Sequence, residues 1–449
     1  MSRLKETVQT WRQDRLLRGL LRNTGYLFSG STINMLLSLV QSMFAAWLLG
    51  VTGVGILGAI TVFTSTLNRL FSFRMSEVVV KYMDQFRAEQ RPERAAALVK
   101  AAALTEASTS LLAFGLLALL APWASVTFAK DASFAPLFLL YGLTIPGNLM
   151  TETSTGVLQV HRRFRSQAAI NIGQSILTAL LIIAAYFAHA GMELVVLAYL
   201  LGKMILGLGP MVLAWQSMVE MFGKGWWRAS FDLLPPLKQL ASFTISTNLS
   251  ATVTLVVRDS EQLWVLYFLS PYAGGLYKVA LAIINLVMVP ITPFISTTYP
   301  EISRSVAEKN WSQLKSLLRQ VTIIAGGFTG IVAVGLLLFG PNLIWIYGKG
   351  PDFLPAYPAL LVLLVGYGIA NALYWNRSLL LALHKPVYPF WVMLAAGSAK
   401  VLLSFVLVPV FGIVAQAGLL SAYLASSVGV ITWKGLSEVK KAAGNRPQP

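Results

Sequence analysis

The chain contains no cysteine and only three histidines in 449 residues. The sequence therefore offers no disulfide framework, no thiol nucleophile and no thiolate metal site. The histidines, His161, His189 and His384, fall at the ends of predicted helices and do not form a metal-ligand cluster. From these absences we expect no metal site and no cofactor.

Charged residues are also scarce, at 12%, whereas apolar residues make up 56%. This composition leaves too little polar surface to cover a soluble globule of this size. Apolar runs recur along the whole chain, and about 20 residues are needed to cross roughly 30 Å of hydrocarbon. The sequence predicts an all-α integral membrane protein with about 12 transmembrane helices.

Sequence signatures of covalent chemistry are missing as well. The chain has no glycine-rich nucleotide loop with its lysine and no Gly-x-Ser-x-Gly element. Every predicted outer loop is short, so none has room for a catalytic domain. We therefore expect a protein that is not an enzyme.

Positive charge lies mainly on one side of the predicted membrane. The net charge is +17, and most of the 35 Lys and Arg residues fall in loops on that side. The exceptions are three on the opposite side, Lys130, Arg258 and Lys349, and those within spans: Arg69, Arg74, Lys203, Lys278 and Lys400. This positive-inside pattern places both termini in the cytoplasm.

Composition also divides the chain into segments. Residues 1–22 combine basic residues with an apolar stripe, which is typical of a helix lying in the membrane interface. Within residues 218–238, Pro235 and Pro236 break any helix, and Trp226 and Trp227 suit the headgroup zone. The predicted segments are 1–22 (cytoplasmic interfacial helix), 23–217 (first lobe, helices 1–6), 218–238 (cytoplasmic linker), 239–433 (second lobe, helices 7–12) and 434–449 (cytoplasmic tail).

Short patterns recur at a spacing of about 220 residues. Trp47, Leu49 and Gly55 match Tyr267, Leu269 and Gly275; Leu158 to Arg162 matches Leu381 to Lys385; and Ala198 to Leu200 matches Ala422 to Leu424. The second copy of the first pattern reads as an outer corner beginning near Arg258, followed by a spanning helix from Tyr272 to about Thr297. The repeats indicate two homologous six-helix lobes.

Basic residues inside predicted spans are the first candidates for function. A central Lys or Arg costs roughly 2.5 to 3.5 kcal/mol on insertion scales and usually faces the bundle interior or a wet cavity. For Arg69, Lys203, Lys278 and Lys400 we favour a cavity over a structural ion pair. Arg74 and Arg258 lie nearer an interface, where snorkelling to headgroups is the simpler interpretation.

The acidic residues within spans are Glu77, Glu106 and Glu152. Arg74 and Glu77 are three residues apart on one helical face, so we expect them to neutralise each other. Glu106 and Glu152 either exchange protons in a coupled cycle or pair with Arg69. The acids beside Arg258, Asp259 and Glu261, are expected to form a solvated cluster at the outer corner.

Together these features resemble a known family. The order of Arg258-Asp259, Gly275-Leu-Tyr277-Lys278, Pro300-Glu-Ile302 and Phe411-Gly412-Ile413 is similar to that in the polysaccharide/oligosaccharide (Wzx-like) flippases of the multidrug/oligosaccharidyl-lipid/polysaccharide (MOP) exporter superfamily. In that family a proline closes helix 8 before an amphipathic cytoplasmic segment, here Glu301 to Gln320.

The resemblance implies two lobes around a central cavity that opens to either side in turn. Its cargo would be an undecaprenyl-diphosphate-linked oligosaccharide, carried from the cytoplasmic to the outer leaflet of a bacterial or archaeal cell membrane. Membrane lipids and a polysaccharide polymerase or glycosyltransferase would be partners, and no nucleic acid is expected. The alternatives are a drug or cation antiporter of the same superfamily and a membrane glycosyltransferase or polymerase.

Overall fold

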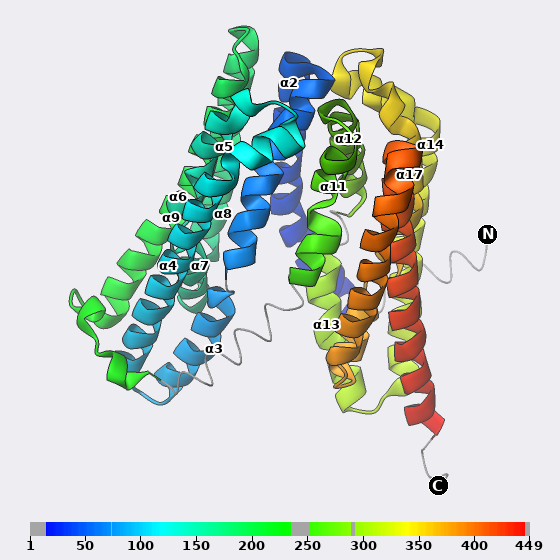
Figure 1. Cartoon of the computed structure of the whole chain (residues 1–449). Helices are drawn as coiled ribbons and strands as arrows, with labels where there is room; N and C mark the ends of the chain where they lie inside the picture. The colour runs from blue at the N-terminus through cyan, green and yellow to red at the C-terminus, as the bar shows by residue number, and fades with distance from the viewer. Residues whose placement is uncertain (1–14, 73, 235–251, 289–291, 445–449) are drawn as a thin grey trace. The chain divides into compact units, whose positions relative to one another are not determined.

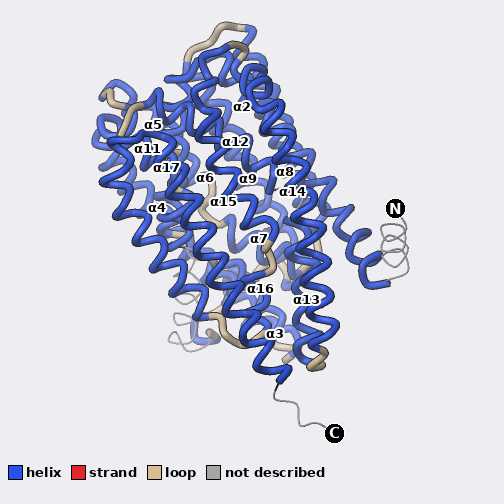
Figure 2. The backbone as a smooth tube through the Cα atoms, turned by 90° about the vertical axis from the view of Figure 1, so that its right-hand side faces the viewer, coloured by secondary structure: helices blue, strands red, loops and turns tan. Residues whose placement is uncertain are grey.

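The computed structural model describes residues 15–72, 74–234, 252–288 and 292–444, and every regular element in these ranges is helical (Figures 1 and 2). Parts of four predicted segments, at 1–14, 235–251 and 445–449, lie outside the described residues: the interfacial helix, the linker, the second lobe and the tail. The main helices are α2 (Arg15–Phe71), α3 (Met75–Ala88), α4 (Pro92–Ala124), α5 (Ala135–Gly142), α6 (Thr144–Gly147), α7 (Thr151–Val160), α8 (Phe164–Phe187), α9 (Met192–Phe222), α11 (Glu261–Phe268), α12 (Pro271–Met288), α13 (Thr292–Ala307), α14 (Trp311–Gly348), α15 (Tyr357–Ala372), α16 (Asn376–Ala382) and α17 (Val387–Gly444).

The chain forms two compact units. The first is Leu37–Lys278, in which α8 packs on α9 and α3 packs on both α4 and α7. The second combines Met1–Leu36 with Val279–Pro449, and there α15 packs on α14 and α17. The lobe boundaries expected from the sequence, near residues 218–238, stay a prediction.

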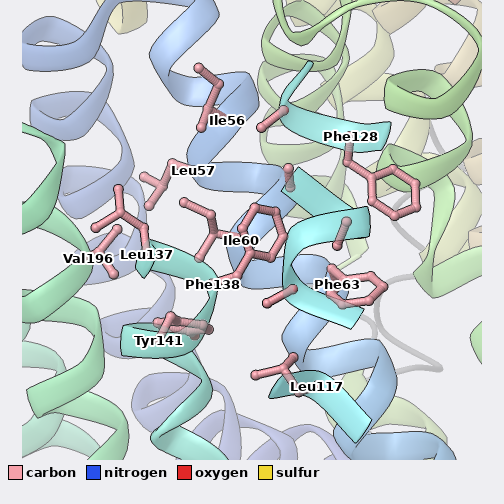
Figure 3. Packing of buried hydrophobic residues seen from close by; sticks show 14 of the residues in the cluster. Ile56, Leu57, Ile60, Phe63, Leu117, Phe128, Leu137, Phe138, Tyr141 and Val196 are labelled. Carbon is pink, nitrogen blue, oxygen red and sulfur yellow. The ribbon is translucent and has the colours of Figure 1, made fainter. Parts of the chain in front are cut away.

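Each unit has its own apolar core. In the first, Ile60 of α2, Leu117 of α4 and Phe138 of α5 are fully buried against one another, as Figure 3 shows. In the second, Leu314 of α14 and Leu379 of α16 are fully buried. These cores come from the helix faces on which apolar residues recur every three or four positions.

The opposite helix faces are apolar too. Leu119 of α4 is 79% exposed, Ile331 of α14 is 75% exposed and Val410 of α17 is 71% exposed. Large apolar side chains in such numbers on a surface mark contact with something other than water. Helices that are apolar all round fit a bilayer, where acyl chains cover the outer face.

Within the described ranges, eight helical stretches are long and apolar enough to cross a membrane. Two of them, Ile33–Ala88 and Val387–Gly444, contain a glycine with a left-handed φ, Gly50 at 65° and Gly412 at 66°. Figure 1 shows the chain turning back at both places. A residue with a side chain adopts this conformation at a cost, so glycine suits each turn. The 18-residue α12 is a further apolar helix, so the described residues hold close to the predicted number of about 12 crossings.

The internal repeat is visible in the backbone. Residues in the left-handed region end helices or turns in both halves of the chain, and they recur about 220 residues apart: Gln90 with Lys309, Lys130 with Lys349, Arg162 with His384, and His189 with Gly412. Equivalent helix ends at nearly one spacing are the structural counterpart of the sequence repeats. They support two homologous halves.

The predicted outer corner lies elsewhere. Helix α11 continues to Phe268, so the reversal occurs at Leu269 and Ser270, and Arg258 sits inside a helical segment rather than in an outer loop. The next helix begins at Pro271, one residue from the predicted start. The charged string Arg258 to Glu261 resembles a loop in the sequence. In the structure the helical segment that contains Arg258 leads directly into α11, so the chain turns only after Phe268.

The cytoplasmic end of that hairpin also differs from expectation. No helix ends at Thr297, because α13 runs to Ala307 with Pro300 inside it. The predicted amphipathic segment Glu301 to Gln320 is divided between α13 and α14, which begins at Trp311. The polar residues between α13 and α14 form a turn. The apolar residues before the turn belong to α13, and those after it belong to α14.

Among the described residues, three spanning stretches are interrupted. The breaks lie between α2 and α3, between α6 and α7, and between α15 and α16. A break inside a span frees backbone N–H and C=O groups, which must be satisfied within the protein because the hydrocarbon offers no partners. The first two breaks position the site described next.

Candidate functional site

A polar pocket of about 340 Å³ lies in the Leu37–Lys278 unit where α2 gives way to α3. It is lined by Arg69, Ser72, Arg74, Ser76, Glu77, Glu152, Thr252 and Leu255. Four of these residues, Arg69, Arg74, Glu77 and Glu152, are among the charged residues that the sequence places within predicted spans. We call this the polar pocket.

Arg69 forms an ion pair with Asp259. The guanidinium Nη1 lies 2.6 Å from the Asp259 carboxylate, across 190 residues of sequence. The Arg69 side chain is 60% exposed and that of Asp259 is 29% exposed. An exposed pair of this kind contributes only about 0 to 1 kcal/mol, so its partners can exchange for another charged group at little cost.

Arg74 and Glu77 pair as their spacing predicts. Nη1 of Arg74 lies 2.8 Å from the Glu77 carboxylate, and both side chains are about half exposed. Arg74 precedes the first residue of α3, and Glu77 lies in the first turn of this helix. A carboxylate there also compensates the positive end of the helix dipole.

Glu152 enters the polar pocket from α7. Its carboxylate accepts a hydrogen bond of 2.5 Å from the Ser76 hydroxyl on α3. The two helices approach closely because Gly156 has no side chain: a Cβ there would lie 2.9 Å from Val79 and 3.0 Å from the carbonyl oxygen of Ser76. Small residues at a helix crossing allow this approach in membranes.

Glu106 holds the broken end of α7. Its carboxylate accepts hydrogen bonds from the backbone N–H groups of Glu152 at 2.8 Å and Thr153 at 2.9 Å, and only 4% of the residue is exposed. The first N–H groups of a helix have no partner within it, so an anion at this position is stabilised. Glu106 therefore connects α4 to the α7 backbone beside Glu152.

The expected pairing of Arg69 with Glu106 or Glu152 is wrong. Arg69 binds Asp259, Glu106 binds the α7 N-terminus, and Glu152 binds Ser76. The break at Asn148 to Met150 supplies free N–H groups that satisfy Glu106 without a cation. Proton coupling by these two acids stays a prediction.

Lys203 lies on the inner face of α9. It shares one stripe with Val196, Gly207 and Ala214, which are buried, yet Lys203 itself is exposed. The lipid-facing stripe of α9, with Val212 at 57% exposure, lies on the opposite side of the helix. Lys203 therefore lies on the side of α9 opposite its lipid-facing stripe.

Lys278 and Lys400 also lie away from the lipid-facing stripes. Lys400 is 3% exposed and shares a buried stripe of α17 with Gly397 and Ser404. Lys278 on α12 is half-buried, and it has no ion-pair or hydrogen-bond partner among the residues described. In the described part of the chain neither lysine, nor Lys203, lines the polar pocket. Within the Leu37–Lys278 unit, the polar pocket therefore contains Arg69 and Arg74 but not Lys203 or Lys278.

The acids beside Arg258 do not form the predicted solvated cluster. Glu261 is 1% exposed and accepts a 2.9 Å hydrogen bond from the Tyr277 hydroxyl, while Asp259 reaches Arg69. Their place inside a helix explains the difference. Ser76 and Thr252 were not singled out from the sequence, and Asp259 was assigned to the outer corner rather than to Arg69. The apolar run after Glu261 was a signal that the helix continues to Phe268.

The chemistry available in the polar pocket is recognition of charge. Guanidinium groups and carboxylates face it together, so it can take a ligand that exchanges with the existing ion pairs. Across the described ranges, no group of three or more His, Asp or Glu side chains is placed to hold a metal ion.

A helical bundle that exposes apolar faces outward and keeps charged groups in its broken helices has the architecture of a multi-pass membrane transporter. The sequence model of the polysaccharide biosynthesis protein family matches residues 20–306, and the chain belongs to that family. The chain is also 24% identical over 355 residues to the inner membrane protein YghQ of Escherichia coli, covering 78% of this chain and 98% of that one.

Solved structures show the same fold. An inward-facing multidrug resistance MATE family transporter of the MOP superfamily is 14% identical, with a TM-score of 0.73 over 92% of this chain and 96% of that one. The lipid II flippase MurJ in an inward closed conformation is 13% identical, with a TM-score of 0.68 over 94% of each chain. The prediction of an all-α membrane bundle of about 12 helices in two homologous lobes is confirmed. The two solved neighbours are described as a transporter and a flippase rather than as enzymes, in agreement with the expectation of a non-enzymatic protein.

Proposed function

We propose that this protein is an alternating-access flippase for an undecaprenyl-diphosphate-linked oligosaccharide, which it moves from the cytoplasmic to the outer leaflet for surface polysaccharide assembly. The observation that carries the proposal is the family match: a polysaccharide biosynthesis protein with a transporter fold acts by moving a glycan intermediate. The similarity to the fold of a lipid II flippase supports the same class of cargo.

Cations are needed wherever a diphosphate crosses hydrocarbon, because an unpaired charge is costly there. Arg69 is the strongest candidate, since its guanidinium is 60% exposed at the polar pocket and its bond to Asp259 is exchangeable. Arg74 lines the same pocket. Lys203, Lys278 and Lys400 would meet the diphosphate at other stages of the cycle.

Coupling to an ion would use the acids of the same region. Glu152 and Glu77 line the polar pocket, and Glu106 contacts the backbone of Glu152. Protonation of any of them would change the balance of charge around Arg69 and Arg74. In this proposal the protein lies in a bacterial or archaeal inner membrane with both termini on the cytoplasmic side. A polysaccharide polymerase or glycosyltransferase acts on the cargo before or after transport.

The test is export of the native glycan from cells that carry Arg69→Ala or Lys278→Ala in place of the natural protein. We expect surface glycan to fall at least tenfold in each variant, with membrane insertion retained. Lys315→Ala removes an exposed charge from α14 outside the polar pocket and is the matched control. Normal export by both Arg69→Ala and Lys278→Ala would disprove the role of these cations in moving the cargo.

A drug or cation antiporter is the second candidate. The polar pocket contains the carboxylates Glu77 and Glu152 as well as two guanidiniums, and carboxylates are the partners that a cationic drug requires. In proteoliposomes, cation-driven efflux of a fluorescent cationic drug that Glu152→Gln abolishes would favour this function. Movement of a lipid-linked oligosaccharide that Arg69→Ala abolishes would favour the flippase.

A further inference from the structure

A second cavity, of about 270 Å³, lies on the other side of α7 from the polar pocket. It is formed by α4, α7, α9 and the turn at Trp226–Arg228, and we call it the tryptophan pocket. Its walls are almost wholly apolar, with Val157, Met211, Trp215 and Trp227 among them. Its volume is near the lower end for small-molecule sites, about 300 Å³, which suits part of a single extended chain.

The tryptophan pocket opens toward the lipid. Its rim residue Leu104 lies on the exposed stripe of α4 with Leu111, seven residues further along. On α9 the rim residue Trp215 lies on the exposed stripe with Leu208 in the same way. Because both stripes face acyl chains, the space between them is reached sideways from the bilayer. The charge pattern assigns this end of α4 and α9 to the cytoplasmic leaflet.

Cationic groups surround the pocket at headgroup level. Lys100 lines it, donating to the carbonyl oxygen of Ala229 at 3.0 Å, and its ammonium lies 4.1 Å from the Phe231 ring. Arg228 stacks over the ring of Trp227, which also lines the pocket. Within the described ranges neither Lys100 nor Arg228 has a carboxylate partner. Their charge is therefore available to an anionic group.

One lining residue carries a buried polar atom without a partner. Trp226 is 9% exposed, and its Nε1 forms no hydrogen bond within the described structure. Trp226 lines the tryptophan pocket. Buried polar groups are usually satisfied, so an unpartnered donor in a cavity points to a ligand oxygen that reaches it.

We propose that the tryptophan pocket binds one anionic phospholipid of the cytoplasmic leaflet. An acyl chain occupies the apolar cavity, an ester or phosphate oxygen reaches Trp226 Nε1, and Lys100 and Arg228 neutralise the phosphate. The bound lipid holds the turn at Trp226–Arg228 against α4 and α9. This site is separate from the proposed cargo site, because α7 lies between the two pockets.

The proposal is tested on the purified full chain in nanodiscs of phosphatidylcholine with about 20% phosphatidylglycerol. This mixture gives the bilayer a negative surface charge like that of a cytoplasmic leaflet. Phosphatidylglycerol and phosphatidylcholine probes with photoactivatable acyl chains are compared by mapping the labelled peptides. We expect the phosphatidylglycerol probe to label the peptide around Met211 preferentially. Lys100→Gln and Arg228→Gln should each lower this preference about fivefold, equivalent to about 1 kcal/mol per basic residue.

Filling the cavity provides a second measurement. Met211→Trp should reduce labelling by both probes, whereas Val212→Trp adds the same side chain on the lipid-facing stripe and should leave labelling unchanged. Lys315→Gln is the control for loss of charge. The proposal is overturned if the two probes label equally, if Met211→Trp has no effect, or if an undecaprenyl phosphate probe displaces phosphatidylglycerol from the peptide. The last result would assign the pocket to the path of the cargo.

Discussion

Gly55 of α2 lies in backbone contact with Gly275 of α12, its counterpart in the internal repeat. A Cβ on Gly55 would overlap the carbonyl oxygen of Pro271 and lie 3.0 Å from the Gly275 nitrogen, and a Cβ on Gly275 would overlap the carbonyl oxygen of Val51. The two copies of the repeat therefore pack against each other, α2 against α12, at these glycines. Only residues without a side chain allow two helices to approach this closely.

Substituting either glycine should destabilise the fold. We expect Gly55→Ala and Gly275→Ala each to cost about 1 to 3 kcal/mol, because the neighbouring atoms belong to backbone and cannot move aside cheaply. Thermal unfolding in detergent, followed by the monodisperse fraction that remains, measures the loss. Gly115→Ala and Gly173→Ala have open space around the added methyl group and should not lower the midpoint. Equal midpoints for all four variants would refute the contact.

The Arg69–Asp259 pair predicts how charge controls cargo binding. Asp259→Asn should leave the unfolding midpoint nearly unchanged, since the pair is exposed, but it frees the Arg69 guanidinium. We expect an undecaprenyl diphosphate to bind several-fold more tightly to this variant and to be released more slowly. Binding is measured by displacement of a fluorescent analogue. Weaker binding would show that Asp259 serves the cargo directly, and Arg69→Ala provides the reference for complete loss.

The contrast between two ion pairs shows what sequence can predict here. Arg74 and Glu77 are three residues apart, so helical geometry alone brings them together. Arg69 and Asp259 are 190 residues apart, and their contact depends on α11 continuing to Phe268 and on how α2 packs beside it. The family-level fold follows from apolar runs and repeats, which are properties of the chain itself.

The candidate site was predictable only in part for a similar reason. Arg69, Arg74, Glu77 and Glu152 were identified because a charged residue in a span is expensive. The partner of Glu106 is a set of backbone N–H groups exposed by a helix break at Asn148 to Met150. Pro146 and Gly147 precede this break and are helix breakers, but they do not indicate which side chain meets the freed N–H groups, so the sequence analysis pointed to a cation instead.

Substitutions of Glu106 distinguish two roles for its carboxylate: holding the N-terminus of α7, and coupling transport to a proton gradient. Glu106→Ala removes both acceptors from two buried N–H groups and should cost about 2 kcal/mol or more. Glu106→Gln keeps one acceptor and should cost less. Unfolding midpoints and transport rates are measured together. If Glu106→Gln folds normally but transport no longer depends on the proton gradient, Glu106 is a coupling group; if transport persists, its role is to hold α7.

The absence of cysteine makes the chain a ready background for mapping which spanning residues meet water. Lys203→Cys is treated with a charged maleimide that does not enter the bilayer, supplied on both sides of proteoliposome membranes. It should react, because position 203 is exposed on the inner stripe of α9. Position 208 is also exposed but faces acyl chains, where a thiolate does not form, so Leu208→Cys should react at least tenfold more slowly. Lys400→Cys, at a position only 3% exposed, should also be slow. Rapid labelling of Leu208→Cys together with protection of Lys203→Cys would reverse the orientation of α9 and remove Lys203 from the interior of the bundle.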